Sequence, residues 1–573
     1  MDFGIWFLLA AAMVFFMQAG FAMVEAGFTR AKNAANIIMK NLMDFCCGTV
    51  CFVLIGFAIM CAEDYVLGFI GVPNLGIFTD FSNFPFSDFV FNLVFCATAA
   101  TIVSGAMAER TKFSAYMIYT VVISAVVYPI EAGWVWNESG WLAQMGYVDF
   151  AGSSAIHMVG GISAFIGAMF LGPRIGKYTA DPETGRKTSR AIPGHSLTLG
   201  ALGCFILWFG WYGFNGAAAE SVPQLGSIFL TTTLAAGAAA VATMTLTWLK
   251  NGKPDVSMTL NGALGGLVGV TAGTSNVDAL GALIIGIVAG ILIVLAVEFI
   301  DLKLHVDDPV GAVAVHGVCG VWGTLAVGLF ATPIAVGEDI ISDVTGLFYG
   351  GGARQLGVQA LGLAAIAAWT AITMCIVFGL IKKTHGLRAS AEDEILGLDS
   401  AEHGLASSYA DFQPAATPDL TALTGKPWDS ASSAHAEVDD AISITNTSTG
   451  KKLTKVTIIT RPIMFDALKD AFDKIDITGV TVTNVQGYGV QRGHTHTYRG
   501  VPLPTPLVPK IQIDVVISKI PVGLFVETVK NVLYTGKIGD GKIFIYDVEN
   551  VVKVRTGETG YDALQDNDRH EAK

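Results

Sequence analysis

Eleven long apolar runs limit what this chain can fold into. A run of about 20 apolar residues is long enough to cross a lipid bilayer as a helix, and a helix pairs its own backbone polar groups there. Of the 573 residues, 52% are hydrophobic and only 14% are charged. We therefore expect an all-α polytopic membrane protein with eleven transmembrane helices. The runs lie near residues 3–24, 34–60, 89–108, 113–130, 151–171, 196–215, 226–249, 259–272, 279–300, 310–330 and 356–381.

Basic residues alternate between the loops that join these runs. Because cytoplasmic loops carry an excess of Lys and Arg, this alternation predicts an outside N-terminus and a cytoplasmic C-terminus in the cytoplasmic (inner) membrane. Arg354 is the one basic residue in a loop that this pattern assigns to the outside. Pro129 falls at the end of the fourth apolar run. The inside basic residues are Arg30, Lys32, Arg110, Lys112, Arg174, Lys177, Arg186, Lys187, Arg190, Lys250, Lys253, Lys303, Lys382, Lys383 and Arg388.

Two nine-residue segments share the pattern D-x-x-G-x-x-A-x-H: Asp149 to His157, and Asp308 to His316. Each begins at a membrane edge, and eight residues of helix rise about 12 Å, which carries each His toward the middle of a hydrocarbon core about 30 Å thick. The charge alternation puts the two Asp residues on opposite sides. This arrangement is typical of an inverted repeat with a shared central site, and ionisable residues at that depth indicate function.

Other interpretations of the paired histidines are packing in the core and ligation of haem or a metal. The eight cysteines have no CxxC spacing, so neither a zinc site nor a disulfide framework is indicated. The net charge of −13 makes nucleic acid an unsuitable partner. Because no nucleophile–base or metal set is apparent, we do not expect an enzyme.

The composition changes after the last run. We expect a membrane domain over 1–383, a charged cytoplasmic regulatory segment over 384–412, a Pro-, Ala-, Thr- and Ser-rich flexible linker over 413–450, a second domain over 451–562 and a disordered tail over 563–573. Within 451–562, strand and helix patterns follow in the order βαββαβ. This order predicts an α+β ferredoxin-like fold.

Five stretches of the membrane part resemble the Amt/Rh ammonium transporter family: GAMAERTKFSA, DFAGSSAIHMVGG, WYGFNGA, DDPVGAVAVHGVCG and GLDSAEHG. The resemblance implies a homotrimer in which each subunit has its own pore for ammonium or ammonia, with no cofactor for transport. The residues that it implies for binding and transport are Phe91, Phe95, Trp136, Asp149, His157, Trp211, Phe214, Ala218, Thr271 and His316.

In this interpretation aromatic rings recruit the cation in an outer vestibule, where a cation–π contact is worth about 1–2 kcal/mol. Asp149 orders the vestibule backbone rather than binding the cation. The cation then loses its proton, the paired imidazoles relay that proton, and a neutral molecule passes, so that K⁺ is excluded. Ala218 stands where the family usually has Ser, which predicts weaker recruitment.

The C-terminal part resembles the PII signal-transduction family through TGVTVTNVQGYGVQRGHT, PKIQIDVV, TGKIGDGKIF and VRTGETG. The resemblance implies binding of ATP or ADP by Thr481, Gly489, Gly539, Gly541, Lys542, Lys553 and Arg555. It also implies binding of 2-oxoglutarate by Gln491 and Lys510, with Gln491 serving Mg²⁺ of the nucleotide. A glycine turn followed by Lys542 suits phosphate oxygens.

The long loop of this part departs from the family pattern. Leu503 occupies the position of the tyrosine that is often modified, between Pro502 and Pro504, whereas Tyr498 and Arg499 remain. In free PII partners of ammonium transporters, the matching Arg enters the cytoplasmic pore mouth. We therefore expect an ammonium transporter gated in cis by its fused PII domain. The alternative is an ammonium sensor that signals through the same tail with little flux.

Overall fold

The computed structural model describes residues 3–73, 84–180, 187–336, 339–405, 408–409, 452–477, 479–487, 497–498, 501–502, 508–536 and 539–564. The chain forms two compact units, Met1–Ala410 and Asp411–Lys573. The expected linker over 413–450 and residues 565–573 of the tail expected over 563–573 lie outside the described residues. The first two residues of that expected tail belong instead to a short 3₁₀ helix, Asp562–Leu564.

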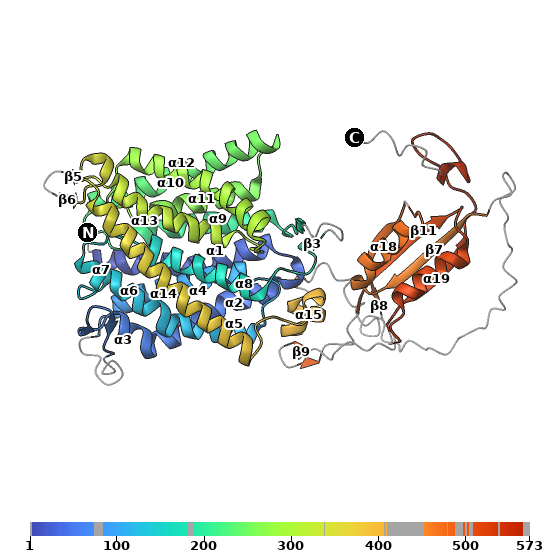
Figure 1. Ribbon diagram of the computed structural model, residues 1–573, viewed down its shortest axis with the longest axis horizontal. Helices are drawn as coiled ribbons and strands as arrows, with labels where there is room; N and C mark the ends of the chain where they lie inside the picture. The colour runs from blue at the N-terminus through green and yellow to red at the C-terminus, as the bar shows by residue number, and fades with distance from the viewer. Residues whose placement is uncertain are drawn as a thin grey trace, which may run out of the picture. The chain divides into compact units, whose positions relative to one another are not determined.

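Unit 1 is a helical bundle (Figure 1). Among the described residues, 10 helices are long and apolar enough to cross a membrane. The shorter α11 (Val256–Thr271), with 16 residues, occupies the expected run at 259–272. The all-helical polytopic fold is thus confirmed. The longer helices contain α1 (Phe3–Phe28), α2 (Ala34–Cys51) with α3 (Phe57–Met60), α4 (Phe86–Ala106), α5 (Phe113–Val122) with α6 (Tyr128–Trp136), α8 (Val159–Leu171), α9 (Leu197–Gly216), α10 (Val222–Asn251), α12 (Ala279–Phe299), α13 (Cys319–Phe330) and α14 (Arg354–Thr384).

The fourth run does not end at Pro129, contrary to the expectation. A π-helical turn, η4 (Ile123–Val127), joins α5 to α6, and the helix continues through Trp136. Proline inside a helix lacks an N–H and crowds the carbonyl four residues earlier. A local π-turn widens the helix at that point, so the chain continues and carries Trp136 to the helix end.

Glycine allows the two repeats to meet at the centre of the bundle. A Cβ atom on Gly161 of α8 would lie 2.1 Å from the backbone nitrogen of Gly317. Gly317 belongs to the π-turn η7 (Val313–Val318), which precedes α13. Small residues permit such close helix contacts in membranes. This contact brings the segments that carry His157 and His316 together.

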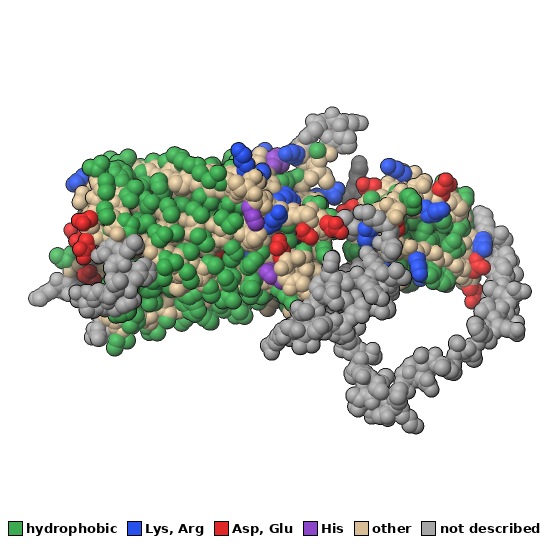
Figure 2. Space-filling view, turned by 90° about the horizontal axis from the view of Figure 1, so that it is seen from below, with side chains coloured by type: hydrophobic (Ala, Val, Ile, Leu, Met, Phe, Trp, Pro, Cys, Tyr) green, Lys and Arg blue, Asp and Glu red, His purple; other side chains and the backbone are tan. Residues whose placement is uncertain are grey.

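On the face drawn in Figure 2, hydrophobic side chains form a broad band over unit 1, and charged side chains gather toward its two ends. Acidic side chains are visible at one end, and Lys, Arg, His and acidic side chains gather together at the other. Such a band is suited to lipid contact, because apolar groups gain by leaving water.

The cytoplasmic segment expected over 384–412 contains two short helices, α15 (Ala391–Leu396) and α16 (Leu398–His403). Asp399 accepts hydrogen bonds from the backbone N–H groups of Ala35 (3.1 Å) and Asn36 (2.8 Å), at the start of α2. Lys32 donates to the carbonyl oxygens of Glu394 and Ile395, at 2.8 Å and 2.6 Å. The segment is therefore bound directly to a transmembrane helix.

Unit 2 contains one antiparallel four-stranded sheet in the order β12-β7-β11-β8. Its core includes Ile458 and Ile513 from the sheet, with Phe472 and Phe525 from the helices stacked 5.4 Å apart. The expected ferredoxin-like fold is confirmed. Its elements are β7 (Thr454–Thr460), α18 (Phe465–Lys474), β8 (Thr481–Gly487), β11 (Val508–Ile517), α19 (Val522–Leu533) and β12 (Lys542–Asp547).

Candidate functional site

His157 and His316 meet in the interior of unit 1. Their Nδ1 atoms are 3.2 Å apart, and their ring planes are inclined by 28°. A hydrogen bond at this distance requires one Nδ1 to donate and the other to accept. Nε2 of His157 is buried and has no partner in the described part of the chain. The pair can therefore share one proton, and Nε2 of His157 is left for a further partner.

The two aspartates of the repeated motif hold these segments in shape. Asp149 accepts hydrogen bonds from the backbone N–H groups of Gly152, Ser153, Ser154 and Ala155, at 2.8–3.0 Å. Burial raises the pKa of Asp149, and these hydrogen bonds oppose the increase. Asp149 therefore orders the backbone at the start of the segment that carries His157.

The second motif repeats this arrangement. Asp308 accepts from the backbone N–H groups of Gly311 (3.0 Å) and Val313 (2.8 Å). Gly152 and Gly311 both have positive φ, 106° and 81°, which explains the glycine of the motif. The histidines lie on π-turns, η5 (Ser153–Met158) and η7, rather than on the regular helix that the rise estimate assumed.

A series of aromatic rings leads from the expected vestibule to the histidines. The ring centroids of Phe91 and Phe95 are 4.2 Å apart, and Phe95 stacks on Phe214 at 4.4 Å. Phe214 in turn stacks on His157 at 5.3 Å. Trp211 stacks on the same histidine at 5.0 Å. Most of the predicted pore residues are thus in one continuous group.

Two tryptophans of this group have fixed positions. The ring centroids of Trp136 and Phe95 are 5.9 Å apart, and Trp136 donates its indole N–H to the carbonyl oxygen of Asp149 at 2.8 Å. Trp211 donates to the hydroxyl of Thr271 at 2.9 Å. Thr271 therefore contacts the aromatic series through the indole of Trp211.

Ala218 is exposed and lines a surface hollow of about 420 Å³. Phe7, Asp88 and Glu220 share the hollow. The ring of Phe7 lies 4.6 Å from Phe91, which connects the hollow to the series. The sequence analysis did not name these three residues. Asp88 could have been found, because it is an acidic residue one helical turn before the predicted site residue Phe91.

An ion-pair network lies among the loops that join the helices of unit 1. Arg174 bonds to Glu109 at 2.7 Å and to Asp307 at 2.8 Å, and Glu109 also pairs with Arg30. Burial alone would raise the pKa of Asp307, but the hydrogen bonds and charge of Arg174, together with the charge of Arg110, lower it to about 2. The sequence analysis used these arginines only for topology and missed the network.

The expected nucleotide site of unit 2 is described in part. Gly489, Gln491 and Arg499 lie outside the described residues. Tyr498 lies in β9 (Thr497–Tyr498), which pairs with β10 (Val501–Pro502). The described members are Thr481 at the start of β8, Lys510 in β11, Gly539, Gly541, Lys542 at the start of β12, Lys553 and Arg555.

The glycine turn before Lys542 is closed by residues that the sequence analysis did not name. The carboxylate of Asp540 accepts from the backbone N–H groups of Thr535 (2.7 Å) and Gly536 (3.1 Å), and it pairs with Arg461 at 3.0 Å. A Cβ on Gly541 would lie 2.5 Å from the carbonyl oxygen of Ile459. The described residues on both sides of Lys537 and Ile538 are therefore held next to Lys542 by hydrogen bonds, an arrangement suited to a phosphate site.

Residues 5–408 match the family model named Ammonium Transporter Family. The chain belongs to that family. Residues 453–558 of the same chain match the model of nitrogen regulatory protein P-II. Both resemblances stated from the sequence are thereby confirmed.

Curated members of the family cover the membrane part. The chain is 45% identical to ammonium transporter Amt2 of Archaeoglobus fulgidus over 71% of this chain and 88% of that protein. It is 42% identical to the putative ammonium transporter sll1017 of Synechocystis, over 70% of this chain and 87% of that protein. These ammonium transporter relatives favour a non-enzymatic membrane protein.

Solved structures of the family have the same fold. A structure titled "Sensor Amt Protein" is 38% identical, with a TM-score of 0.64, and covers 70% of this chain and 98% of that chain. The crystal structure of Saccharomyces cerevisiae Mep2 is 27% identical, with a TM-score of 0.59, over 68% of this chain and 88% of that chain.

Proposed function

We propose that this family member moves ammonium through a pore in each subunit of a homotrimer, by cation recruitment, deprotonation and passage of ammonia. The observation that supports this proposal most directly is the buried histidine pair at the end of the aromatic series, whose Nδ1 atoms are 3.2 Å apart. A full charge in the bilayer centre costs at least about 2.5–3.5 kcal/mol. A neutral molecule avoids that cost, and its proton can travel along the imidazoles.

Selectivity follows from the same chemistry. K⁺ resembles ammonium in charge but has no proton to lose, so it cannot cross the stacked rings of Phe95 and Phe214 as a neutral species. The rings recruit ammonium by cation–π attraction, and Asp88 and Glu220 keep the neighbouring hollow acidic. The basic loop pattern supports an outside N-terminus in the cytoplasmic membrane.

The test is an ammonium concentration jump on proteoliposomes mounted on a solid-supported membrane. The proposal expects a transient current that saturates with ammonium and is absent after an equal K⁺ jump. Equal currents for the two ions, or no current and no uptake of ammonium, would contradict the proposal.

For unit 2 we propose gating of the pore by adenine nucleotides and 2-oxoglutarate. Lys542, next to the glycine turn, would hold the phosphates together with Lys553 and Arg555. Gln491 and Lys510 would serve Mg²⁺ and 2-oxoglutarate. Covalent attachment keeps the local concentration of the tail near millimolar, so a weak contact would suffice for docking. ADP would permit docking through Arg499, and ATP with Mg²⁺ and 2-oxoglutarate would release it.

An ammonium sensor with little flux is the second candidate function. Two observations favour it: the similarity to a structure titled "Sensor Amt Protein" and the absence of a hydroxyl at Ala218. The histidine pair and the aromatic series favour transport. The current and uptake measurements above separate the two candidates, because a sensor would bind ammonium with little uptake into the liposomes.

A further inference from the structure

Three ionisable side chains are buried beside the pore and have no role in the function proposed so far. Glu25 lies on α1, and Lys40 and Asp44 lie on α2, with exposed fractions of 3%, 0% and 0%. Buried charges in a membrane are costly. Their presence next to the pore therefore calls for a physical explanation.

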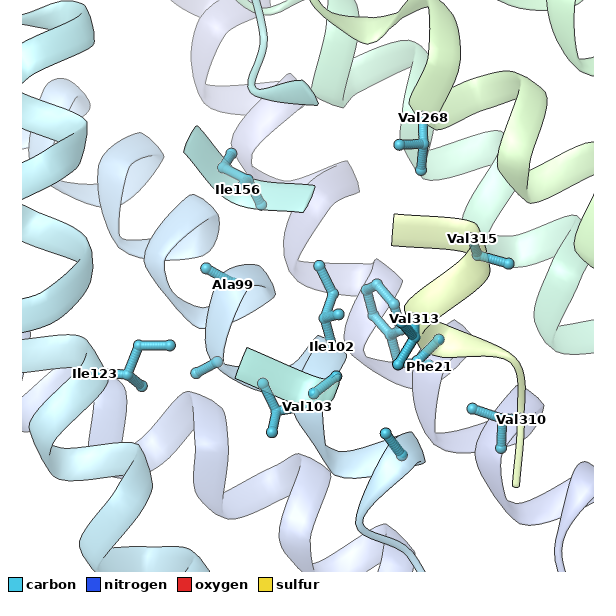
Figure 3. Close-up of a cluster of buried hydrophobic side chains, with 14 of the residues drawn as sticks. Phe21, Ala99, Ile102, Val103, Ile123, Ile156, Val268, Val310, Val313 and Val315 are labelled. Atoms are coloured by element: carbon cyan, nitrogen blue, oxygen red, sulfur yellow. The ribbon is translucent and has the colours of Figure 1, made fainter. Parts of the chain in front are cut away.

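A small cavity connects this group to the histidine pair. Its volume is about 30 Å³, and both Glu25 and His316 line it, with Asn261 as a further polar side chain. Phe21, Ile102, Val310 and Val315 form its apolar wall and are labelled in Figure 3. One water needs about 10–15 Å³ of such volume and a few polar partners. The cavity can therefore hold water between His316 and Glu25.

The hydrogen bonds distinguish the two carboxyl groups. Asp44 accepts from the hydroxyls of Tyr116 and Thr120, each at 2.7 Å, which favours its carboxylate form. Glu25 Oε2 accepts from the amide of Asn41 at 3.2 Å, and Oδ1 of Asn41 has no partner among the described residues. Glu25 is the carboxyl group that borders the cavity.

The charges of the group make it suited to hold one proton. Lys40 forms no ion pair shorter than 4 Å with a described carboxylate; its ammonium lies 3.5 Å from the carbonyl oxygen of Ser104 and 5.0 Å from the ring centre of Tyr116. One ammonium balances one of two carboxylates. The group is therefore neutral when Glu25 is protonated and carries one negative charge when it is not, and Lys40 makes the second state accessible.

We propose that Glu25 receives the proton from the histidine pair on the cytoplasmic side of the pore. The inference rests on the proposed function. An imidazolium N–H of His316 gives its proton to cavity water, which gives a proton to the Glu25 carboxylate. His316 becomes neutral, and Glu25 becomes a carboxylic acid. Glu25 then releases the proton to water toward the cytoplasm, three residues before the end of α1 at Phe28, and is a carboxylate again.

The charged and titratable groups around Glu25 are known from the same contacts. Lys40 and Asp44 act on it from α2, and His316 faces it across the cavity from η7. Tyr116 on α5 is held by Asp44. Among the described residues that line the cavity, Glu25 and His316 are the ones with titratable side chains.

The test compares current and lumen pH in proteoliposomes of the full chain after an ammonium jump, with an entrapped pH dye. In the wild type, proton and ammonia enter together. In Glu25→Gln we expect the current to fall about tenfold or more, as for loss of a positioned proton acceptor, while ammonia entry alone makes the lumen alkaline. Glu298→Gln, at an exposed pair with Lys250, is the matched control and should behave as wild type.

Wild-type current in Glu25→Gln would overturn the relay, and so would loss of both current and alkalinisation in a variant that elutes normally in detergent. If the wild type itself gives neither current nor uptake, the proposed function fails instead. A second measurement tests the proposal on the wild-type protein, in case Glu25→Gln does not fold. Infrared difference spectra of wild-type protein, with and without ammonium, should contain a change in the carboxylic acid C=O band. Its absence would overturn the proposal.

Discussion

Asp149 and Asp308 occupy equivalent positions in the two halves of unit 1, each accepting backbone N–H groups of a turn that carries a pore histidine eight residues later. Gly152 and Gly311, with positive φ, complete both turns. The two halves therefore build the centre of the pore from the same local structure.

Replacement of Asp149 by Asn should destabilise the protein. Asn offers one acceptor oxygen, and its NH₂ group would face backbone N–H groups that now donate to Asp149. Hydrogen bonds to a charged group contribute about 1.5–3 kcal/mol each. We expect a lower melting temperature in detergent for Asp149→Asn than for Asp308→Asn. An unchanged melting temperature would contradict the capping role.

Gly161→Ala should stop transport although it removes no polar group. The added methyl would lie 2.1 Å from the backbone nitrogen of Gly317, so α8 and η7 must separate, and the histidines with them. Gly237→Ala in α10, with nothing within 4 Å of the added carbon, is the control. Ammonium currents equal in both variants would show that the close contact is unnecessary.

Ala218→Ser should lower the half-saturating ammonium concentration severalfold. The hollow around Ala218 already holds Asp88 and Glu220, and a hydroxyl adds an acceptor for a cation there. The measurement is the concentration dependence of the ammonium current at constant expression. Asp88→Asn should raise the same concentration. No shift in either variant would exclude the hollow from recruitment.

Acid should destabilise unit 1 through Asp307. Its pKa is lowered to about 2 by Arg174 and Arg110 despite burial, against about 3.9 in an unfolded chain. The stabilisation is present above the unfolded value and is lost as the pH falls toward 2. Arg174→Met should therefore lower the melting temperature at pH 6 and reduce its further decline in acid. Parallel wild-type and variant curves would contradict this.

The tail should close its own pore when ADP is bound. Deletion of residues 451–573 should leave a constitutively active transporter, and Arg499→Ala should weaken closure. The measurement is ammonium current with ADP, and then with ATP, Mg²⁺ and 2-oxoglutarate, on the cytoplasmic side. Identical currents, in a protein that binds both effectors, would reject gating by the tail.

Much of the fold could be predicted from the sequence, because hydrophobic runs and the βαββαβ order depend on local patterns. The repeated Asp–Gly–His motif also predicted the meeting of His157 and His316. Other features depend on tertiary contacts that no local pattern encodes. The hollow shared by Phe7 and Ala218 and the cavity beside Glu25 are of this kind, whereas the π-turn before Pro129 follows from the proline itself.

The relay through the histidine pair is the central claim, and ion selectivity tests it most directly. The measurement is the current of wild type and His157→Ala in proteoliposomes after equal jumps of ammonium and of K⁺. The account expects wild type to respond to ammonium alone, and His157→Ala either to lose the ammonium current or to conduct K⁺ as well. An unchanged ammonium current with K⁺ still excluded in His157→Ala would contradict it.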